Sequence, residues 1–169
     1  MSDRYDITPD GDIAVSTRVR LARNLEGIPF PSKMSAAERR ELNGRVKAAL
    51  LESNTPFAKS LKYIDMKSVP ENEIAAMVER HTISPEFAAD PSERAVILSA
   101  DESISIMIGE EDHIRIQVIL GGLQLEKAYD TAETLDRLLY DSLHFAFDKD
   151  LGFLTECPTN LGTGMRASV

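Results

Sequence analysis

The chain has 169 residues, the size of one domain, and it is 43% hydrophobic, 28% charged and 6% aromatic, as soluble globular proteins are. Its 19 basic and 28 acidic side chains give a net charge of −9, which argues against broad nucleic-acid binding because such binding needs an extended positive surface. An anion site in this chain therefore requires positive charge that is concentrated locally. The single cysteine excludes an intrachain disulfide and fits a reducing compartment.

The amino-terminal residues 1–12 are polar and acidic, so we expect a lead-in segment and not a signal peptide. No apolar run approaches the length of about 20 residues that spans a bilayer. Association with a membrane is therefore not expected, and the cytoplasm is the expected location. Residues 13–169 are expected to form one domain.

The first regular element is a strand that begins at Ile13, because apolar and polar residues alternate from there to Arg20. Side chains two positions apart in a strand share a face, so Arg18 and Arg20 project together from its polar side. The prolines within 28–32 interrupt regular structure. A capping box at Ser35–Glu38 then predicts a helix that runs to about residue 52.

The rest of the chain alternates between strands and helices. Strands are predicted over 61–66, 95–99, 104–108, 114–118, 151–157 and 165–169, short helices after Pro70 and near Phe87, and a long helix over 123–147. The turn at 109–112 makes a hairpin of the strands beside it. This order predicts an α+β fold in which helices cover the apolar face of an antiparallel sheet and the polar face stays open.

Three segments carry residues that are suited to chemistry. Arg18 and Arg20 repel each other unless an anion or carboxylates neutralise them, and their planar forks suit phosphate oxygens; a solvated basic edge is the plainer interpretation. The three acids of 110–112 are typical of a solvated turn, but Arg115 lies on the polar face of the next strand and can join the other two arginines. Cys157 precedes a proline turn and a Gly-Thr-Gly loop that allows close backbone approach, although a lone cysteine is often a small buried hydrophobe.

Other familiar site patterns are missing from the sequence. His81, near a helix end, is typical of a C-terminal cap. No spacing of histidine, cysteine and acidic residues indicates a zinc site. There is also no Walker A sequence and no kinase-type glycine loop.

Taken together, STRVRLARN (16–24), GEEDHIRI (109–116) and CPTNLGTGMRASV (157–169) resemble the phosphagen (ATP:guanido) kinase family in content, order and spacing. Within that family, RLARNLEGIPFP, ERHTISPEF and LGGLQLEKAYD resemble the bacterial protein arginine kinases of the McsB type. The resemblance runs from about Ile13 to Val169. It implies a catalytic domain of the guanido kinase and glutamine synthetase-like fold, truncated at its carboxyl end because family members continue further.

The resemblance also implies roles for individual residues. ATP binding is implied for Ser16, Thr17, Arg18, Val19, Arg20, His81, Arg115, Arg166, Ala167, Ser168 and Val169. Glu111 matches the catalytic carboxylate, with Glu110 and Asp112 as lesser electrostatic partners. Cys157 matches the cysteine that orients the guanidinium without acting as a nucleophile. No metal-ligating side chain is assigned, and Mg²⁺ is expected to accompany ATP.

The activity that the resemblance implies is transfer of a phosphoryl group from Mg-ATP to arginine side chains of proteins. The helical domain that precedes the catalytic domain in small-metabolite kinases is missing, which favours a protein-borne arginine over a free guanidine. Implied partners are arginine-bearing proteins, an activator protein and a Clp-type protease system. A truncated, inactive module that binds nucleotide or a partner is the alternative. A strand edge left open at Val169 would favour dimers or aggregates.

Overall fold

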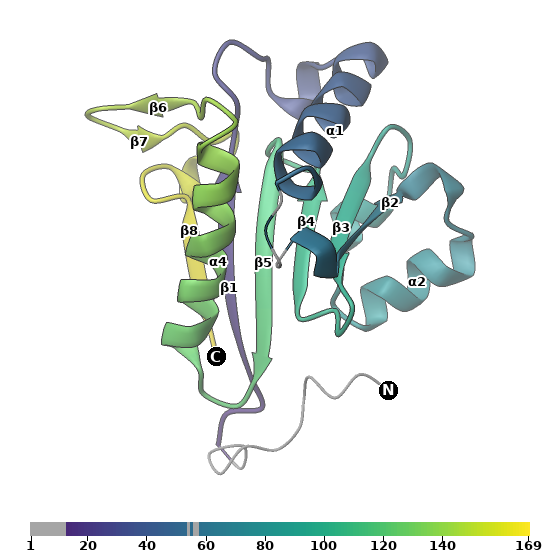
Figure 1. The fold of residues 1–169 in the computed structure, drawn as a ribbon, viewed down its shortest axis with the longest axis vertical. Coiled ribbons are helices and arrows are strands. Elements are labelled where there is room, and N and C mark those ends of the chain that lie inside the picture. Colours follow the sequence, from purple (N-terminus) through teal and green to yellow (C-terminus); the bar gives the residue numbers. More distant parts are fainter. Residues whose placement is uncertain (1–12, 54, 56–57) are drawn as a thin grey trace.

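The computed structural model describes residues 13–53, 55 and 58–169, so the expected lead-in at 1–12 lies outside the described residues. Its helices and strands are β1 (Ser16–Arg23), α1 (Ala36–Leu51), β2 (Leu61–Asp65), α2 (Glu71–Glu79), α3 (Pro85–Ala88), β3 (Ala95–Ser99), β4 (Ile104–Ile108), β5 (Ile114–Gly121), α4 (Leu125–Tyr140), β6 (Phe147–Asp148), β7 (Gly152–Phe153) and β8 (Met165–Ser168) (Figure 1). Short 3-10 turns lie between them.

The architecture is a six-stranded sheet in the order β2-β3-β4-β5-β1-β8, and every neighbouring pair of strands is antiparallel. The first strand of the chain therefore lies inside the sheet, between β5 and β8. Strands β6 and β7 form a separate two-stranded hairpin. The predicted α+β fold with an antiparallel sheet is confirmed.

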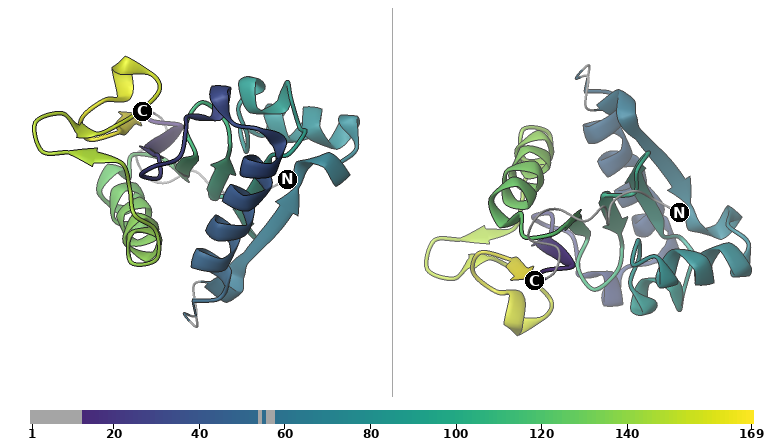
Figure 2. Two further views of the ribbon diagram at one scale, coloured as in Figure 1. Left: turned by 90° about the horizontal axis from the view of Figure 1, so that it is seen from above. Right: turned by 90° about the horizontal axis from the view of Figure 1, so that it is seen from below.

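One face of the sheet is covered by α1 and α4, which lie on the same side of it (Figure 2). The larger core lies between this face and the two helices. Its fully buried side chains include Leu42 and Val46 of α1, Ile106 and Ile116 of the sheet, and Leu135 of α4. These residues recur at helical spacing in the helices and at every second position in the strands, as the alternation of the sequence predicted.

The second face of the sheet is divided into two regions. Over β3 and β4 it is covered by α2, α3 and the turns beside them, with Phe87, Met77 and Met107 in a second apolar cluster. Over β5, β1 and β8 it carries polar side chains. The expected open polar face is therefore confined to these three strands, because the apolar residues Val96 and Leu98 of β3 turn toward α2 and α3.

Local features explain where α1 begins. The Ser35 hydroxyl accepts a hydrogen bond from the Glu38 backbone N–H, and the Glu38 carboxylate accepts one from the Ser35 backbone N–H. This is the predicted capping box.

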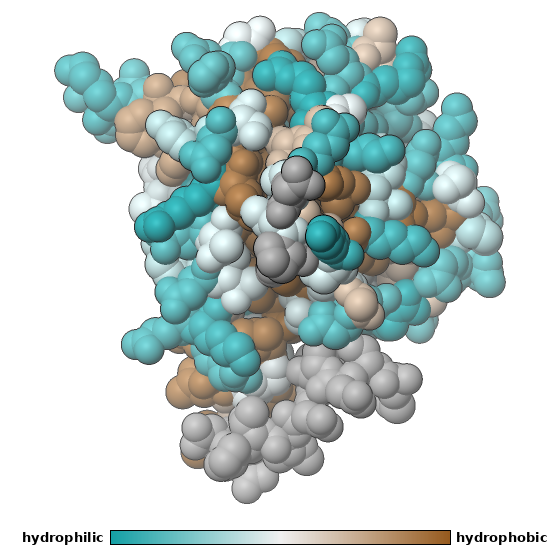
Figure 3. Space-filling model, in the orientation of Figure 1, coloured by the Kyte–Doolittle hydropathy of each residue, from teal (hydrophilic) through white to brown (hydrophobic). Residues whose placement is uncertain are grey.

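The face over α1 and α4 is largely hydrophilic, with apolar side chains visible between them (Figure 3). None of the helices in the described ranges is long and apolar enough to cross a membrane.

Three predicted boundaries were wrong. Strand β1 begins at Ser16, and Ile13 and Val15 are 95% and 72% exposed, because the partner strand β5 ends at Gly121, opposite Ser16. Helix α4 ends at Tyr140 and not at residue 147. The predicted strand over 151–157 shrinks to the two residues of β7, since the chain after α4 instead forms the β6-β7 hairpin.

Candidate active site

Four arginines gather on the polar region of the sheet. Arg18 and Arg20 share one face of β1, and the antiparallel register of β8 places Arg166 directly opposite Arg20. On the neighbouring strand β5, Arg115 lies two residues from Gln117, the residue opposite Arg20, and so shares its face. Partial burial and repulsion from the other three arginines lower the pKa of Arg20 from its usual value. The cluster is therefore an electropositive patch that an anion would stabilise.

A small cavity of about 50 Å³ lies at the centre of this patch. Its lining comprises Arg20, Leu21, Ala22, Glu111, Arg115, Cys157, Thr159, Asn160, Gly164 and Arg166. The proposed catalytic pair, Glu111 and Cys157, thus lines one hollow together with three of the four arginines, although these residues come from three distant segments of the chain.

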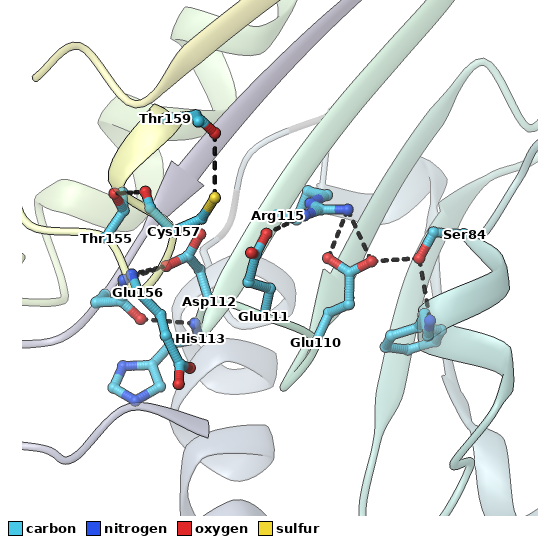
Figure 4. A network of polar contacts seen from close by, with 12 residues as sticks. Ser84, Glu110, Glu111, Asp112, His113, Arg115, Thr155, Glu156, Cys157 and Thr159 are labelled. Carbon is cyan, nitrogen blue, oxygen red and sulfur yellow. Dashed lines mark hydrogen bonds and ion pairs between the residues drawn. The ribbon is translucent and has the colours of Figure 1, made fainter. Parts of the chain in front are cut away.

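The acidic turn is held by one arginine, Arg115, which forms ion pairs with two of its carboxylates (Figure 4). Arg115 donates from Nη1 to Glu110 Oε1 at 2.7 Å and from Nη2 to Glu111 Oε2 at 3.1 Å. The Glu110 side chain is 2% exposed and also contacts the Ser84 hydroxyl, whereas the Glu111 side chain is 40% exposed. Glu110 therefore anchors Arg115, and Glu111 is the carboxylate that a ligand can reach.

Arg94 supports the same turn, although no motif in the sequence pointed to it. Its Nε donates to the Gly109 carbonyl at 2.8 Å, and its Nη1 donates to the carbonyls of Glu86 and Phe87 at 2.7 and 2.8 Å. Burial lowers the pKa of Arg94 from its usual value. A cavity of about 480 Å³ lies beside it, lined by Arg20, Glu86, Arg94, Glu110, Glu111 and Arg115. The accessible carboxylate thus borders two cavities.

A third cavity, of about 230 Å³, lies at the other end of the arginine patch. Its lining includes five residues to which the resemblance assigned ATP binding, namely Ser16, Arg18, His81, Ser168 and Val169, together with Ile119. His81 is exposed, and its backbone has a φ of 57°. The structure therefore brings these five residues to one hollow, which includes Arg18 of the arginine patch.

Three residues of the implied ATP set lie elsewhere. Thr17 is fully buried on the opposite face of β1, where its hydroxyl donates to the Gly122 carbonyl at 2.6 Å and accepts from the Gln124 N–H at 2.9 Å. Val19 belongs to the main core, and Ala167 of β8 lies opposite it in the pairing of β8 with β1. The period of two that places Arg18 and Arg20 on the polar face turns these three side chains away from it.

The loop that carries Cys157 is tied to β1 through a glycine. Cys157 Sγ lies 3.0 Å from Thr159 Oγ1. Further along, the Gly164 carbonyl accepts from the Ala22 N–H at 2.7 Å. A side chain at Gly164 would place Cβ 2.6 Å from both the Ala22 carbonyl oxygen and Arg23 Nη1. The close approach expected of the Gly-Thr-Gly loop is thus made to the protein's own strand, at the edge of the cavity.

The described part of the chain contains no group of three or more histidine, cysteine or acidic side chains arranged to hold a metal ion. The arginines instead make the site suited to binding a polyanion, next to one carboxylate, that of Glu111, which a ligand can reach. Arginine forks of this kind match phosphate oxygens, and all four arginines line one or other of two cavities: Arg20, Arg115 and Arg166 line the first, and Arg18 lines the other. The residues present therefore fit a nucleoside triphosphate.

This combination of an antiparallel α+β sheet, clustered arginines and a reachable carboxylate defines a phosphotransferase catalytic domain. The family model described as "ATP:guanido phosphotransferase, C-terminal catalytic domain" matches residues 41–169, and the chain belongs to this family. The resemblance that the sequence motifs indicated is confirmed.

Curated relatives narrow the comparison within the family. Proteins named protein-arginine kinase from Halothermothrix orenii and Clostridium acetobutylicum are 48% and 45% identical to this chain over 162 and 160 residues. The alignments cover 95% of this chain but 45% and 47% of the relatives, so the chain spans about half the length of the curated relatives it matches.

Solved structures share the fold. The duplicated taurocyamine kinase from Schistosoma mansoni with bound transition state analog components has a TM-score of 0.85 at 30% identity, covering 96% of this chain and 24% of that one. Lombricine kinase has a TM-score of 0.77 at 21% identity, covering 95% of this chain and 48% of that one. At that identity, the second likeness concerns the fold alone.

Proposed function

We propose that this chain is part of a protein arginine kinase, which transfers the γ-phosphoryl group of Mg-ATP to a guanidinium nitrogen of an arginine side chain in a protein. One observation carries the proposal: Glu111 and Cys157 line a single cavity together with Arg20, Arg115 and Arg166. The arginines can neutralise the negative charge of a phosphoryl group, and the carboxylate can align a guanidinium and accept its proton.

On the nucleotide side, Arg18, Arg20 and Arg166 would bind the phosphates, with His81 and Ser168 beside the third cavity toward the nucleoside. The spread negative charge of the transferring phosphoryl group is stabilised by cations that are already in place. Mg²⁺, which prefers phosphate and water oxygens as ligands, would neutralise further charge when bound with ATP. Thr17, Val19 and Ala167 are left out of this set because their side chains lie on the other face.

On the acceptor side, an arginine guanidinium is protonated at neutral pH, because its pKa lies far above 7, and is then a poor nucleophile. Glu111 would align it and take its proton while the N–P bond forms and the bond from phosphorus to the ADP oxygen breaks. Cys157, which lines the same cavity, would orient the guanidinium. The products are ADP and an N-phosphorylated arginine.

The protein-borne acceptor is supported by the names of the curated relatives, which are 40–48% identical. We extend the proposal to an activator protein and a Clp-type protease system as partners, to a cytoplasmic location and to self-association. Self-association is supported by β8, which within the described residues lies at the edge of the sheet, since open strand edges promote pairing between chains.

The test incubates the chain with labelled Mg-ATP and an arginine-rich protein and measures acid-labile phosphate on that protein. We expect phosphate on the protein and little competition from free arginine. Strong competition would indicate a small-guanidine kinase. Nucleotide binding without transfer to either acceptor would reject the kinase and favour the alternative, a nucleotide-binding module.

A further inference from the structure

A buried hydrogen-bond junction lies behind the proposed catalytic pair. Asp112 directly follows Glu111, and Glu156 directly precedes Cys157. Asp112 Oδ1 accepts a hydrogen bond from the Glu156 backbone N–H at 2.9 Å (Figure 4) and another from Asn24 Nδ2 at 2.7 Å. One carboxylate oxygen therefore joins the two segments that carry Glu111 and Cys157.

The Asn24 side chain links the same segments a second time. Its Oδ1 accepts from the His113 backbone N–H at 2.8 Å, and its Nδ2 also donates to the Leu154 carbonyl at 3.0 Å. Asn24 is 2% exposed, and Asp112 and His113 are fully buried. Breaking hydrogen bonds in such a place leaves buried polar groups without partners, so the arrangement resists change.

The His113 ring fixes the junction to the chain that follows β1. Its Nδ1 accepts from the Leu25 backbone N–H at 2.9 Å, which assigns the proton to Nε2, 2.8 Å from the Pro29 carbonyl. Burial lowers the pKa of His113, which favours this neutral form. The acidic turn thus has a rigid support on the side away from the arginines.

We propose that Asn24 and Asp112 are positioning residues, which set where the Cys157 thiol lies relative to the Glu111 carboxylate. Neither side chain lines the cavity of the catalytic pair, so they act through the backbone of their neighbours. A displacement of about 1 Å in a reacting group can cost about 100-fold in rate. The kinetic part of this proposal rests on the proposed function, whereas the placement of Cys157 can be measured without catalysis.

A matched control separates positioning from general support of the fold. Asn43 on α1 is also a buried asparagine, 8% exposed, and its Nδ2 donates to the Glu93 carbonyl at 3.1 Å. It lines none of the three cavities of the site. Asn43→Ala therefore removes a buried amide of the same kind without touching the junction.

The experiment measures how fast iodoacetamide alkylates Cys157, which is the chain's single thiol. In Asn24→Ala the loop loses its anchor, and we expect alkylation to be about fivefold faster than in the unchanged chain because the thiol spends more time exposed. We expect Asn43→Ala to alkylate at the unchanged rate although it is destabilised. In kinase assays, Asn24→Ala should lower kcat by about 10- to 100-fold and leave the KM for ATP within about twofold.

Equal alkylation rates in Asn24→Ala and Asn43→Ala would overturn the proposal. If Asn24→Ala does not fold, Asp112→Asn provides the measurement, since it keeps the shape and an accepting oxygen but loses the charge that strengthens both hydrogen bonds. Its alkylation rate should rise about twofold, and an unchanged rate with an unchanged kcat would refute the positioning role. A chain that transfers no phosphate but shows the expected alkylation rates would refute the proposed function and leave the placement of Cys157 supported.

Discussion

The glycine at the cavity edge offers a sharp test of how closely β8 approaches β1. Gly164 has a φ of +61°, and an added Cβ would lie 2.6 Å from the Ala22 carbonyl oxygen and from Arg23 Nη1. Gly164→Ala therefore carries two penalties: a left-handed backbone, which costs about 1 kcal/mol, and overpacking against backbone and a buried guanidinium, which costs about 1–3 kcal/mol. Together these predict a loss of about 2–4 kcal/mol in the free energy of unfolding.

Two other glycines separate these penalties. Gly27 has a φ of +73° with no atom within 4 Å of the added Cβ, so Gly27→Ala should show the backbone cost alone. Gly44 lies inside α1 with ordinary helical dihedrals and open space around it, so Gly44→Ala should raise the free energy of unfolding by about 0.5–1 kcal/mol.

Urea unfolding of the three variants provides the measurement. The expected order of stability is Gly44→Ala, the unchanged chain, Gly27→Ala and then Gly164→Ala. In a domain of this size each kcal/mol shifts the melting temperature by about 2–4 °C, so the differences are resolvable. If Gly164→Ala were as stable as Gly27→Ala, β8 would not approach β1 as described. The result would then also contradict the placement of Arg166 beside Arg20.

Four further predictions follow from the site and its supports. Glu111→Gln should lower phosphoryl transfer by at least about 100-fold while ATP affinity in a nucleotide titration stays nearly intact; an equal loss of ATP binding would reject the general-base role. Arg20→Gln should weaken ATP binding and reduce its dependence on salt, because Arg20 lines both the cavity of the catalytic pair and its neighbour; unchanged titrations at low and high salt would remove Arg20 from the phosphate site. The lowered pKa of His113 means that the unfolded chain binds the proton first, so stability should fall as the pH drops below about 6.5, the usual histidine value; urea midpoints that fall equally in His113→Gln would exclude this cause. Arg23→Met should cost about 3 kcal/mol of stability in urea unfolding, because Arg23 is 4% exposed and makes two hydrogen bonds of 2.9 Å to Asp136; a loss below about 1 kcal/mol would show a pair worth no more than a surface ion pair.

Local rules were enough for the elements and for half of the arginine patch. The capping box at Ser35 begins α1 because its hydrogen bonds close within one turn. Arg18 and Arg20 share a face because successive residues of any strand alternate. The same rule buries Thr17 and Val19, which the family resemblance had placed in the ATP set.

The boundaries that were wrong depend on partners far along the chain. Alternation continues back to Ile13, yet β1 begins at Ser16 because β5 ends opposite it. The chain after α4 departs from helix at Tyr140 and buries Phe145, which forms a bridge with Leu25. Neither limit is visible in the local pattern, since the first depends on where β5 ends and the second accompanies a contact with Leu25.

Strand alternation by itself placed Arg18 and Arg20 on one polar face, because successive residues of a strand point to opposite sides. The family resemblance of the sequence motifs indicated Glu111, Cys157 and Arg166. The tertiary structure alone decided how these residues meet. Arg166 lies opposite Arg20 through the register of β8, Arg115 holds Glu110 and leaves Glu111 reachable, and Asn24 joins Asp112 to the loop of Cys157. The pairing of Arg166 with Arg20 and the hydrogen bonds of Asn24 connect residues at least 88 positions apart. Such contacts are selected by packing and strand register, which involve the whole chain.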